Sequence, residues 1–411
     1  MMMNIRKLSA AILLTAGMAL PQAVMGANDG LPHDDLAPTP PMGWMTWNLF
    51  KDNISDQLIR EMADAMVEKG YRDAGYTYIF IDDAWQGGRD NRNNIIPDPK
   101  KFPNGIKALA DYVHSRGLKL GIYSDAAQLT CAGYTASLGF EQQDARTFAS
   151  WGIDYLKYDY CNAPTDEKTA RKRYAAMAKA LRESGRDIVL GVCEWGPRKP
   201  WHWAHEVGGS LWRTTYDVRD MWKDVVGQGG MGILDIINQS DTLSQYAGRG
   251  HWNDLDMLVV GLDGKGGPSS DLGGKGCTAD EYRTQMSMWC MLSSPLAMTN
   301  DLRHDNAAVR DILLNKDIIA INQDALGQPA VPKGRMGNCR IYLRHLSGDR
   351  LAIAVMNDND QPQRVTVPFA KLGIGRIYSY KDIWTGKSTK HAASWKGSLR
   401  PHQTAVLLLT K

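Results

Sequence analysis

Carboxylate and aromatic side chains recur where short apolar runs end along this chain. A single aspartate in such a place is ordinarily a turn former or a helix cap. Seven apolar runs end in this way, however, and converging carboxylates repel one another, so such crowding is typical of functional sites. The residues at these ends are Trp47 and Asn48; Asp82, Asp83 and Trp85; Tyr123 and Asp125; Lys157 and Asp159; Cys193, Glu194 and Trp195; Arg213 and Asp217; and Asp254 and Asp256.

Tryptophan beside carboxylate suits a sugar ring, because the apolar face of the ring packs on an indole while its hydroxyl groups donate to carboxylate oxygens. The chain has 13 tryptophans. Trp47, Trp85 and Trp195 lie at the ends of runs and are predicted to be sugar platforms. Trp151 and Trp289 lie in helix-like stretches and are predicted to be core residues instead.

Glycoside hydrolysis is the chemistry that two such carboxyl groups could perform. One attacks the sugar or activates water, the other donates a proton to the leaving group, and in an enzyme that retains configuration they lie roughly 5 Å apart. Asp159 and Asp217 come from neighbouring regions of the chain's strand-like part and form a reasonable pair. Position alone does not separate them from Asp83 or Asp256.

These residues need a scaffold that brings the ends of many strands together. From residue 43 to about residue 296 the sequence alternates strand-like runs with helix-like stretches, as in repeated βα units. Eight such units close most simply into a (β/α)8 barrel, whose active site lies at the carboxyl ends of the strands. An open doubly wound sheet is the alternative, but no GxGxxG loop follows the first run. The runs span residues 43–48, 76–82, 118–124, 153–159, 188–194, 210–215, 252–260 and 293–298.

Amphipathic stretches fill the gaps between these runs. The clearest extends from Ser55 to Lys69, with Ser55 as its N-cap and Gly70 as the residue that ends it. The stretches 106–116 and 169–183 have the same character. With its helices, the predicted barrel spans residues 38–330.

The sequence pattern changes after the segment INQDALGQP at residues 321–329. Five β-like runs separated by turn residues have no helical partners, which is typical of a small antiparallel β-sandwich. We predict that this domain spans residues 331–411, begins near Pro332, and carries no catalytic constellation. Its runs are RIYLRH, RLAIAVMN, QRVTVPF, RIYSY and TAVLLLT.

The composition is that of a folded protein, and the balance of charges favours an uncharged partner. Charged residues make up 23% of the chain, and 48 basic and 45 acidic residues are mixed along it, for a net charge of +3. This pattern has no electrostatic footprint for nucleic acid. The 411 residues are enough for a barrel of about 250 residues and a smaller domain.

The N-terminus has the pattern of an export signal. Two basic residues precede an apolar run at residues 8–20, and small residues at 26 and 27 suit cleavage. We predict a signal peptide at residues 1–26 and a mature protein in the periplasm or outside the cell. A retained membrane anchor is the alternative, but the run is shorter than the roughly 20 residues that span a bilayer. No later segment is predicted to span a membrane.

Six cysteines would stand in an oxidising compartment after export, where disulfides form. The sequence contains no CxxC pair and no Cys/His cluster with zinc spacing, and His202 and His205 are an isolated pair. We therefore predict no metal site, and no motif indicates a cofactor.

Seven short motifs follow one another in order along the predicted barrel. Together they resemble the α-galactosidases and α-N-acetylgalactosaminidases of glycoside hydrolase family 27, in its plant and microbial branch. The resemblance covers roughly residues 38–330, and INQDALGQP and the terminal sandwich also fit the family. The motifs are PPMGWMTWN, IDDAWQ, GIYSD, DYLKYDYC, CEWG, LWRTTYD and WNDLDMLVVG.

By this resemblance Asp159 in KYDYC is the nucleophile, and Asp217 in WRTTYD is the general acid and then the base. The implied mechanism is double displacement through a β-linked galactosyl intermediate, which retains configuration. It requires Asp159 to be ionised, beside cations such as Lys157, and Asp217 to hold a proton in a less solvated place.

The galactose pocket of the family corresponds to a larger set of residues. Asp82 and Asp83 are expected to accept hydrogen bonds from O4 and O6, so that a misplaced hydroxyl would leave a buried carboxylate unpaired. Lys157 and Arg213 are expected to hold hydroxyls near the reaction centre, and Trp47 to pack on the apolar face. The set is Trp47, Asp82, Asp83, Tyr123, Cys131, Lys157, Glu194, Trp195, Arg213 and Asp256.

The resemblance also implies a disulfide between Cys131 and Cys161, beside the nucleophile. Two free buried thiols are the alternative. The other four cysteines stay unassigned: Cys193, Cys277, Cys290 and Cys339.

The segment CEWG bears on which sugar is preferred. The N-acetyl branch lines the space at C2 with small residues, whereas Glu194 and Trp195 are large, and Glu194 can accept from a 2-hydroxyl. This favours an exo-acting α-galactosidase. After CEW the sequence departs from the animal pattern, which leaves open whether Trp195 or a following loop residue touches C2.

Three alternatives share this scaffold. An α-N-acetylgalactosaminidase is the first, and a β-L-arabinopyranosidase, whose sugar lacks the hydroxymethyl group, is the second. The intact Asp82 and Asp83 indicate a pocket that still accommodates O6. The third is a sugar-binding protein without catalysis, and the presence of both Asp159 and Asp217 argues against it.

Overall fold

The computed structural model describes residues 35–227, 229–265, 276–375 and 378–411. The predicted signal peptide, at residues 1–26, lies outside these ranges. Within them, no helix has the length and apolar character needed to cross a membrane.

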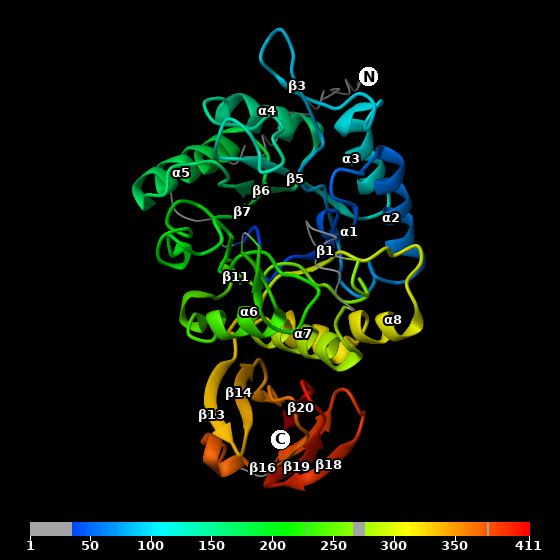
Figure 1. The fold of residues 1–411 in the computed structure, drawn as a ribbon, viewed down its shortest axis with the longest axis vertical. Coiled ribbons are helices and arrows are strands. Elements are labelled where there is room, and N and C mark those ends of the chain that lie inside the picture. The colour runs from blue at the N-terminus through cyan, green and yellow to red at the C-terminus, as the bar shows by residue number, and fades with distance from the viewer. Residues whose placement is uncertain (1–34, 228, 266–275, 376–377) are drawn as a thin grey trace, which may run out of the picture. The chain divides into compact units, whose positions relative to one another are not determined.

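Among the described residues, eight parallel strands form one sheet in the order β11-β8-β7-β6-β5-β2-β1-β12 (Figure 1). Leu258, shortly after β11, forms a parallel bridge to Met298 in β12, so the two edges of the sheet meet. The predicted (β/α)8 barrel is confirmed, and the open sheet is wrong. The strands are β1 (Met42–Met45), β2 (Tyr78–Phe80), β5 (Lys119–Asp125), β6 (Tyr155–Asp159), β7 (Val189–Val192), β8 (Leu211–Arg213), β11 (Trp252–Asp254) and β12 (Leu296–Met298).

Helices alternate with these strands, and α2 shows how the local sequence sets their ends. The Ser55 hydroxyl accepts from the Leu58 backbone N–H, and Gly70 follows the last turn with a φ of 82°. Both were predicted from residue type. The helices are α1 (Trp47–Phe50), α2 (Asp56–Glu68), α3 (Gly105–Ser115), α4 (Glu141–Trp151), α5 (Glu167–Glu183), α6 (Ile233–Ser240), α7 (Ala279–Met291), α8 (Ala307–Leu313) and α9 (Lys316–Asn322).

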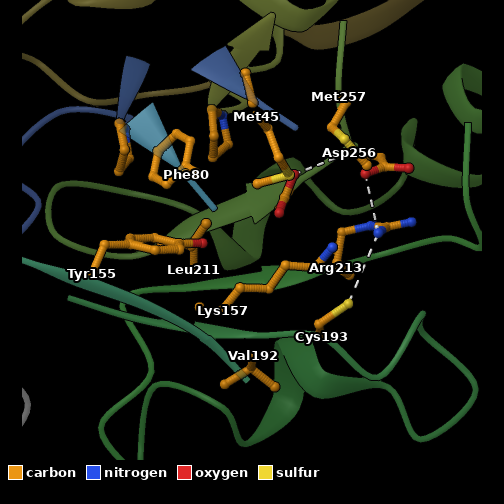
Figure 2. A pocket seen from close by; sticks show the side chains of 15 residues that line it. Met45, Phe80, Tyr155, Lys157, Val192, Cys193, Leu211, Arg213, Asp256 and Met257 are labelled. Atoms are coloured by element: carbon orange, nitrogen blue, oxygen red, sulfur yellow. Dashed lines mark hydrogen bonds and ion pairs between the residues drawn. The ribbon is translucent and has the colours of Figure 1, made fainter. Parts of the chain in front are cut away.

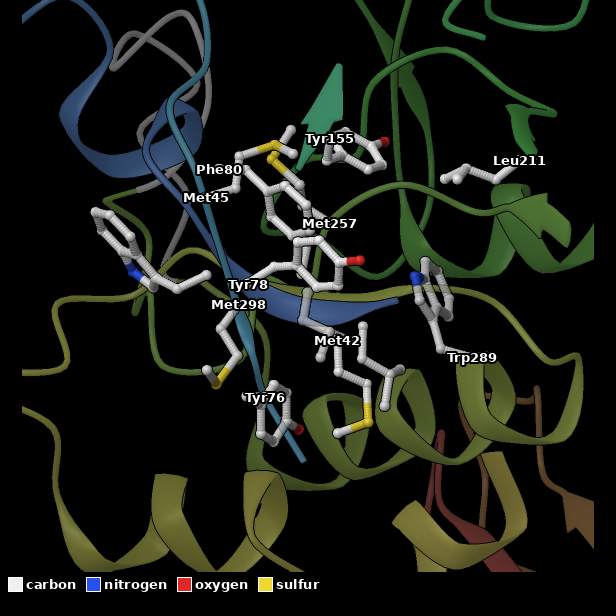
Figure 3. Close-up of a cluster of buried hydrophobic side chains, with 14 of the residues drawn as sticks. Met42, Met45, Tyr76, Tyr78, Phe80, Tyr155, Leu211, Met257, Trp289 and Met298 are labelled. Carbon is white, nitrogen blue, oxygen red and sulfur yellow. The ribbon is translucent and has the colours of Figure 1, made fainter. Parts of the chain in front are cut away.

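Aromatic and sulfur-containing side chains pack inside the barrel. The Phe80 ring stacks on Tyr78 at 5.3 Å between centroids and meets Tyr155 edge on at 4.7 Å. Figure 3 shows Met45 and Met257 beside this group. Because this interior is filled by buried side chains, polar groups that act on a ligand must lie at the ends of the strands.

Two hairpins interrupt the predicted alternation of strands and helices. β3 (Gln86–Arg89) pairs with β4 (Ile95–Pro97) between β2 and α3, and β9 (Val225–Val226) pairs with β10 (Gly230–Met231) between β8 and α6. Each follows the carboxyl end of a barrel strand. Both hairpins are therefore placed where they can shape the site.

The described residues of the C-terminal region form two antiparallel sheets, which confirms the predicted β-sandwich. One sheet has the order β13-β14-β15-β20-β17-β18, and the other is β16-β19. The sequence pattern did not predict β13, β18 and β19. The side chains of β13 and β18 are largely exposed, and β19 has only two buried side chains, Trp395 and Leu399. The strands are β13 (Val331–Met336), β14 (Cys339–Leu346), β15 (Arg350–Met356), β16 (Gln363–Pro368), β17 (Tyr378–Asp382), β18 (Ser388–Ala392), β19 (Ser394–Leu399) and β20 (Thr404–Thr410).

The larger sheet of the sandwich has two buried faces. Ala354 and Val406, which are paired across β15 and β20, belong to the same hydrophobic core as the barrel. Their neighbours Ile353 and Leu407, also paired, face a second core that the smaller sheet covers. Alternate residues of a strand point to opposite faces, so this sheet packs on the barrel with one face and completes the sandwich with the other.

Candidate active site

A cavity of about 680 Å³ lies at the carboxyl ends of the barrel strands. This volume is typical of sites for small ligands. Its walls come from strands and following segments that are far apart in the sequence, as expected at this end of a barrel. The lining residues are Trp47, Asp82, Asp83, Tyr123, Cys131, Ala132, Lys157, Asp159, Cys161, Asn162, Trp195, Tyr216, Asp217, Arg219, Val226, Gly227 and Met257.

Nine of the twelve residues predicted to act on the sugar line this cavity. The other three, Glu194, Arg213 and Asp256, are covered by neighbouring atoms, with exposures of 0%, 2% and 5%. A residue that does not reach the cavity acts through the residues that it holds in place.

Asp159 ends β6 and lies opposite Asp125 of β5 in the strand register. One of its carboxylate oxygens accepts from the Tyr160 backbone N–H at 2.9 Å, and the other accepts from the Tyr123 hydroxyl at 3.0 Å. Each oxygen therefore has a donor, and together the two donors fix the plane of the carboxylate at the cavity wall.

Asp82 and Asp83 follow β2 and are held by different donors. The Lys157 ammonium donates to Asp82 at 2.8 Å. Asp83 accepts from the backbone N–H groups of Ala84 at 2.7 Å and Ala132 at 2.9 Å. The cation expected beside the nucleophile is thus bonded to Asp82.

Arg213 lies beneath the cavity and connects the predicted acid to its support. Its guanidinium donates to Asp217 at 3.1 Å and lies 3.1 Å from Asp256, which accepts from the Val218 backbone N–H at 2.7 Å. Figure 2 shows Arg213 between Asp256 and Cys193, around an interior cavity of about 30 Å³ that is too small for a sugar. Arg213 and Asp256 therefore position the segment that carries Asp217, whereas direct contact with sugar hydroxyls was expected of them.

Glu194 is wholly buried and does not line the cavity, contrary to the expectation that it meets the 2-hydroxyl. Its carboxylate accepts from the backbone N–H groups of Gly196 at 3.0 Å and Arg198 at 3.1 Å, and it pairs with the Arg198 guanidinium at 2.9 Å. Because these donors lie in the loop that follows β7, the carboxylate points into that loop. Trp195 is the member of CEWG that reaches the cavity.

Trp85 is a core residue, although its position predicted a sugar platform. Its ring is fully buried against Phe148 and Trp151 of α4, and its indole N–H donates to the Tyr123 carbonyl at 2.8 Å. The side chain therefore lies between the sheet and the helix layer. Trp151 and the fully buried Trp289 are core residues, as predicted.

Trp195 has a φ of 61°, which is uncommon for a large side chain and is often found at functional sites. Its ring is nearly parallel to that of Tyr216, with an interplanar angle of 18° and 6.3 Å between centroids. The two rings form an aromatic wall on the cavity, and Trp47, which begins α1, also lines it.

The two predicted catalytic carboxyls differ in charge, but in the opposite sense to the one expected. Burial raises the pKa of Asp159 to about 7, against the opposing effect of Lys157. Burial also raises the pKa of Asp217, but the nearby cations, Arg213 first among them, outweigh it and leave that pKa below its usual value. The reversal arises because Arg213 bonds to Asp217, while the cation expected beside Asp159 is bonded elsewhere.

The disulfide between Cys131 and Cys161 is present, with 5.1 Å between the two Cα atoms. The bond ties the segment whose Ala132 N–H holds Asp83 to the segment that follows Asp159. It therefore links the predicted sugar-binding carboxylates to the predicted nucleophile. The other four cysteines are buried free thiols: Cys193, Cys277, Cys290 and Cys339.

In the part of the chain that the structure describes, one group of side chains has metal-ligand spacing, namely Asp125, Cys131, Asp159 and Cys161. Its two sulfur atoms belong to the disulfide, which leaves two carboxyl groups. Burial, and then the charge of Asp159, raise the pKa of Asp125 to about 9. Asp125 is thus a neutral acid at neutral pH, and such a pair is a poor ligand set for a cation.

Several lining residues were not singled out from the sequence. Tyr216 and Arg219 flank Asp217, and Val226 and Gly227 belong to the β9–β10 hairpin. Tyr216 belongs to the motif WRTTYD, and nearness to that motif in the sequence is the only signal for the other three. They reach the cavity because the hairpin folds back against the segment after β8.

Two family models match the chain in succession. The model described as Alpha galactosidase A matches residues 39–324, and the Alpha galactosidase C-terminal beta sandwich domain matches residues 336–409. The Alpha-galactosidase A of Cellvibrio japonicus is 41% identical over 416 residues, which cover 97% of this chain and 98% of that protein. The Alpha-N-acetylgalactosaminidase of Gallus gallus is 39% identical over 86% of this chain and 88% of its own length.

The solved structure of alpha-galactosidase I from Mortierella vinacea is also similar to this chain. Its TM-score is 0.85 at 35% sequence identity, with 92% of this chain and 98% of that chain covered. Sequence and fold thus agree over the barrel and the sandwich. This chain is therefore a glycoside hydrolase of the α-galactosidase family, glycoside hydrolase family 27.

Proposed function

We propose that this chain hydrolyses terminal, non-reducing α-D-galactosyl residues with retention of configuration, through a covalent intermediate on Asp159. One observation carries the proposal: Asp159 and Asp217 line a single cavity that Asp82 and Asp83 also line. The first pair supplies the carboxyls for bond cleavage, and the second supplies buried acceptors for the sugar hydroxyls.

In the first step, a carboxylate oxygen of Asp159 bonds to the anomeric carbon. The bond from that carbon to the leaving oxygen breaks, and Asp217 donates its proton to that oxygen. In the second step, Asp217 accepts a proton from water, the water oxygen bonds to the anomeric carbon, and the ester bond to Asp159 breaks. The product is α-galactose. Tyr123, which donates to Asp159, holds the carboxylate in place through both steps.

Selectivity for galactose follows from buried acceptors and from the shape at C2. The axial O4 of galactose donates to Asp82 or Asp83, whereas the equatorial O4 of glucose leaves the remaining acceptor position of these buried carboxylates unfilled. Since Glu194 turns away from the cavity, discrimination against a 2-acetamido group rests on Trp195.

The substrate is tested by comparing kcat/KM on three nitrophenyl glycosides. These are the α-D-galactoside, the N-acetyl-α-D-galactosaminide and the β-L-arabinopyranoside. We expect the fastest rate on the first. A fastest rate on either of the others would assign the chain to that alternative activity.

The role of Asp159 is tested with Asp159→Asn. We expect turnover to fall on the order of 10⁴-fold, as for other residues that act directly in bond making, while galactose binding stays measurable by calorimetry. The control is Asp187→Asn, because Asp187 is exposed and precedes β7 at the opposite end of the barrel. Normal turnover in Asp159→Asn would refute the assignment.

Azide separates the nucleophile from the acid. With Asp159→Gly and a nitrophenyl α-galactoside, azide attacks the substrate directly and forms the β-galactosyl azide. With Asp217→Ala, azide attacks the β-linked intermediate and forms the α-galactosyl azide. The reverse pattern of products would exchange the two roles.

We further propose that residues 1–26 direct export and are removed. The proposal is supported by the basic, apolar and small-residue pattern of that segment. N-terminal sequencing of the protein from the periplasm or the medium is expected to begin near Ala27. An intact N-terminus on a cytoplasmic protein would contradict it.

A further inference from the structure

The part of the cavity beside Asp217 is bordered by the aromatic wall of Trp195 and Tyr216. Tyr216 is 41% exposed and directly precedes Asp217 in the chain. A leaving group must lie within hydrogen-bond reach of the acid that protonates it. The two rings therefore border the place where the leaving group of the substrate lies.

Arg219 lines the same cavity and is an incompletely paired cation. Its Nε and Nη1 atoms are shielded from solvent and have no hydrogen-bond partner among the described residues. Asp217 and Asp256, the two carboxylates whose charges act on Arg219, are each bonded to Arg213 instead. Burial lowers the pKa of Arg219, against the opposing effect of those two carboxylates. A half-buried guanidinium without a bonded anion is unfavourable unless a ligand supplies one.

The β9–β10 hairpin is shaped around these side chains. A Cβ on Gly229 would lie 2.8 Å from the Tyr216 ring, and a Cβ on Gly230 would clash with Arg219 Nε. The Arg219 backbone N–H also donates to the Met231 carbonyl at 2.8 Å. Glycines at both positions thus let the hairpin close on Tyr216 and Arg219 and hold them at the cavity wall.

We propose that this region is a leaving-group subsite for α-galactosides whose aglycone carries an oxyanion, either a carboxylate or a sulfate. The aromatic wall packs against the aglycone ring, and Arg219 attracts its oxyanion. Attraction between charges does not require contact with the two shielded nitrogen atoms. The inference deepens the proposed function and rests on it, since galactose must occupy the part of the cavity lined by Asp82 and Asp83.

An oxyanion beside Arg219 also assists the acid. Although burial raises it, the pKa of Asp217 is held below its usual value by neighbouring cations, of which Arg219 is one. An anion that offsets the charge of Arg219 weakens this effect, so Asp217 more readily holds the proton that the leaving oxygen needs. A substrate with an acidic aglycone therefore binds more tightly, and its leaving oxygen is protonated more readily by Asp217.

The test uses two aryl α-galactosides of similar size, one with 3-hydroxybenzoate as the leaving group and one with its methyl ester. The quantity measured is the ratio of kcat/KM for the carboxylate to kcat/KM for the ester. Intrinsic differences between the leaving groups cancel when this ratio is compared between enzymes. We expect Arg219→Gln to lower the ratio about tenfold, the scale of a short-range attraction between two charges near a protein surface, and Arg219→Lys to keep part of it.

A matched control removes a charge elsewhere. Arg171 lies on α5, is partly exposed and pairs with Glu167 and Glu206 outside the cavity lining, so Arg171→Gln is expected to leave the ratio unchanged. The α-galactoside of 3-hydroxyphenyl sulfate is a third substrate that distinguishes the two anions. If kcat/KM relative to the ester depends on Arg219 for both anionic substrates, the subsite accepts oxyanions in general. If it depends on Arg219 for only one of them, the subsite is specific for that anion.

Two results separate failure of the subsite from failure of the proposed function. If Arg219→Gln lowers both rates equally, Arg219 acts only on Asp217 and the subsite is refuted. α-Galactosyl fluoride has a leaving group that needs neither a subsite nor an acid. If the wild-type enzyme hydrolyses this fluoride and Arg219→Gln has the same carboxylate-to-ester ratio as wild type, the subsite alone is refuted. If the wild-type enzyme does not hydrolyse the fluoride, the proposed function is refuted.

Discussion

Asp159 is surrounded by groups that act on its charge in opposite directions. Burial raises its pKa to about 7, and Lys157, which is bonded to Asp82, lowers it. Burial acts on Asp217 in the same direction, but the bonded Arg213 and other cations bring its pKa below the usual value. When the pair holds a single proton, that proton therefore lies mainly on Asp159. The reactive arrangement, with the proton on Asp217, is the minor form.

This distribution predicts that kcat/KM falls as the pH rises through about 7. Retaining hydrolysis needs one proton on the pair, and the pair holds two below the lowered pKa of Asp217, one between the two pKa values, and none above about 7. A pH profile of kcat/KM on the nitrophenyl α-galactoside checks it. Activity that stays constant well above that pH would show that the two carboxyls do not share a proton in this way.

Residue type and position predicted which carboxylates gather at the barrel mouth but not which of them face the cavity. Asp82 and Asp159 line it. Glu194 instead accepts from a backbone N–H of the loop that follows it, and Asp256 accepts from the Val218 backbone N–H. All four end or follow strands of the same sheet. Their different roles depend on donors that come from other segments.

The ends of helix α2 are determined by nearby residues. Ser55 accepts from the Leu58 backbone N–H at 3.2 Å and so satisfies one of the first unpaired donors of the helix. Ser55→Ala is expected to lower the free energy of unfolding by about 0.5–2 kcal/mol. Urea denaturation measures the change.

The control for this change is Ser150→Ala in α4, where the hydroxyl is exposed and donates to the Thr147 carbonyl. We expect that substitution to have a much smaller effect. Equal losses in the two variants would show that capping is not what Ser55 contributes.

Elements with a regular apolar period were predictable, and those without one were not. Each of the eight predicted barrel runs contains or overlaps a strand, because a buried strand needs continuous apolar residues. The β3–β4 and β9–β10 hairpins, the largely exposed β13 and β18, and β19 with its two buried side chains have no such run. The residues of the inferred leaving-group subsite lie beside one of these unpredicted hairpins.

The barrel and the sandwich share a hydrophobic core, so their stabilities are coupled. Leu346 of β14 is 4% exposed and belongs to the core that includes the barrel. Leu346→Ala is expected to lower the free energy of unfolding by about 2–5 kcal/mol, since it leaves a cavity between two packed layers. Far-UV circular dichroism and enzyme activity, followed together through denaturation, measure it.

We expect both signals to shift to the same extent in Leu346→Ala. Leu326→Ala is the control, because Leu326 is 42% exposed and its truncation leaves no buried cavity. A variant in which the sandwich unfolds first while activity keeps its wild-type midpoint would show that the shared core does not couple the two domains.

The sequence by itself determined the order of strands and helices, the succession of a barrel and a sandwich, and the strand ends where the chemistry lies. These depend on period, caps and turn residues, which are properties of neighbouring positions. Only the tertiary structure decided that Glu194 and Arg213 lie behind the cavity wall, that Lys157 bonds to Asp82, and that Arg219 reaches the cavity. Burial and ion pairing depend on distances between side chains from different strands, and no local pattern encodes those distances.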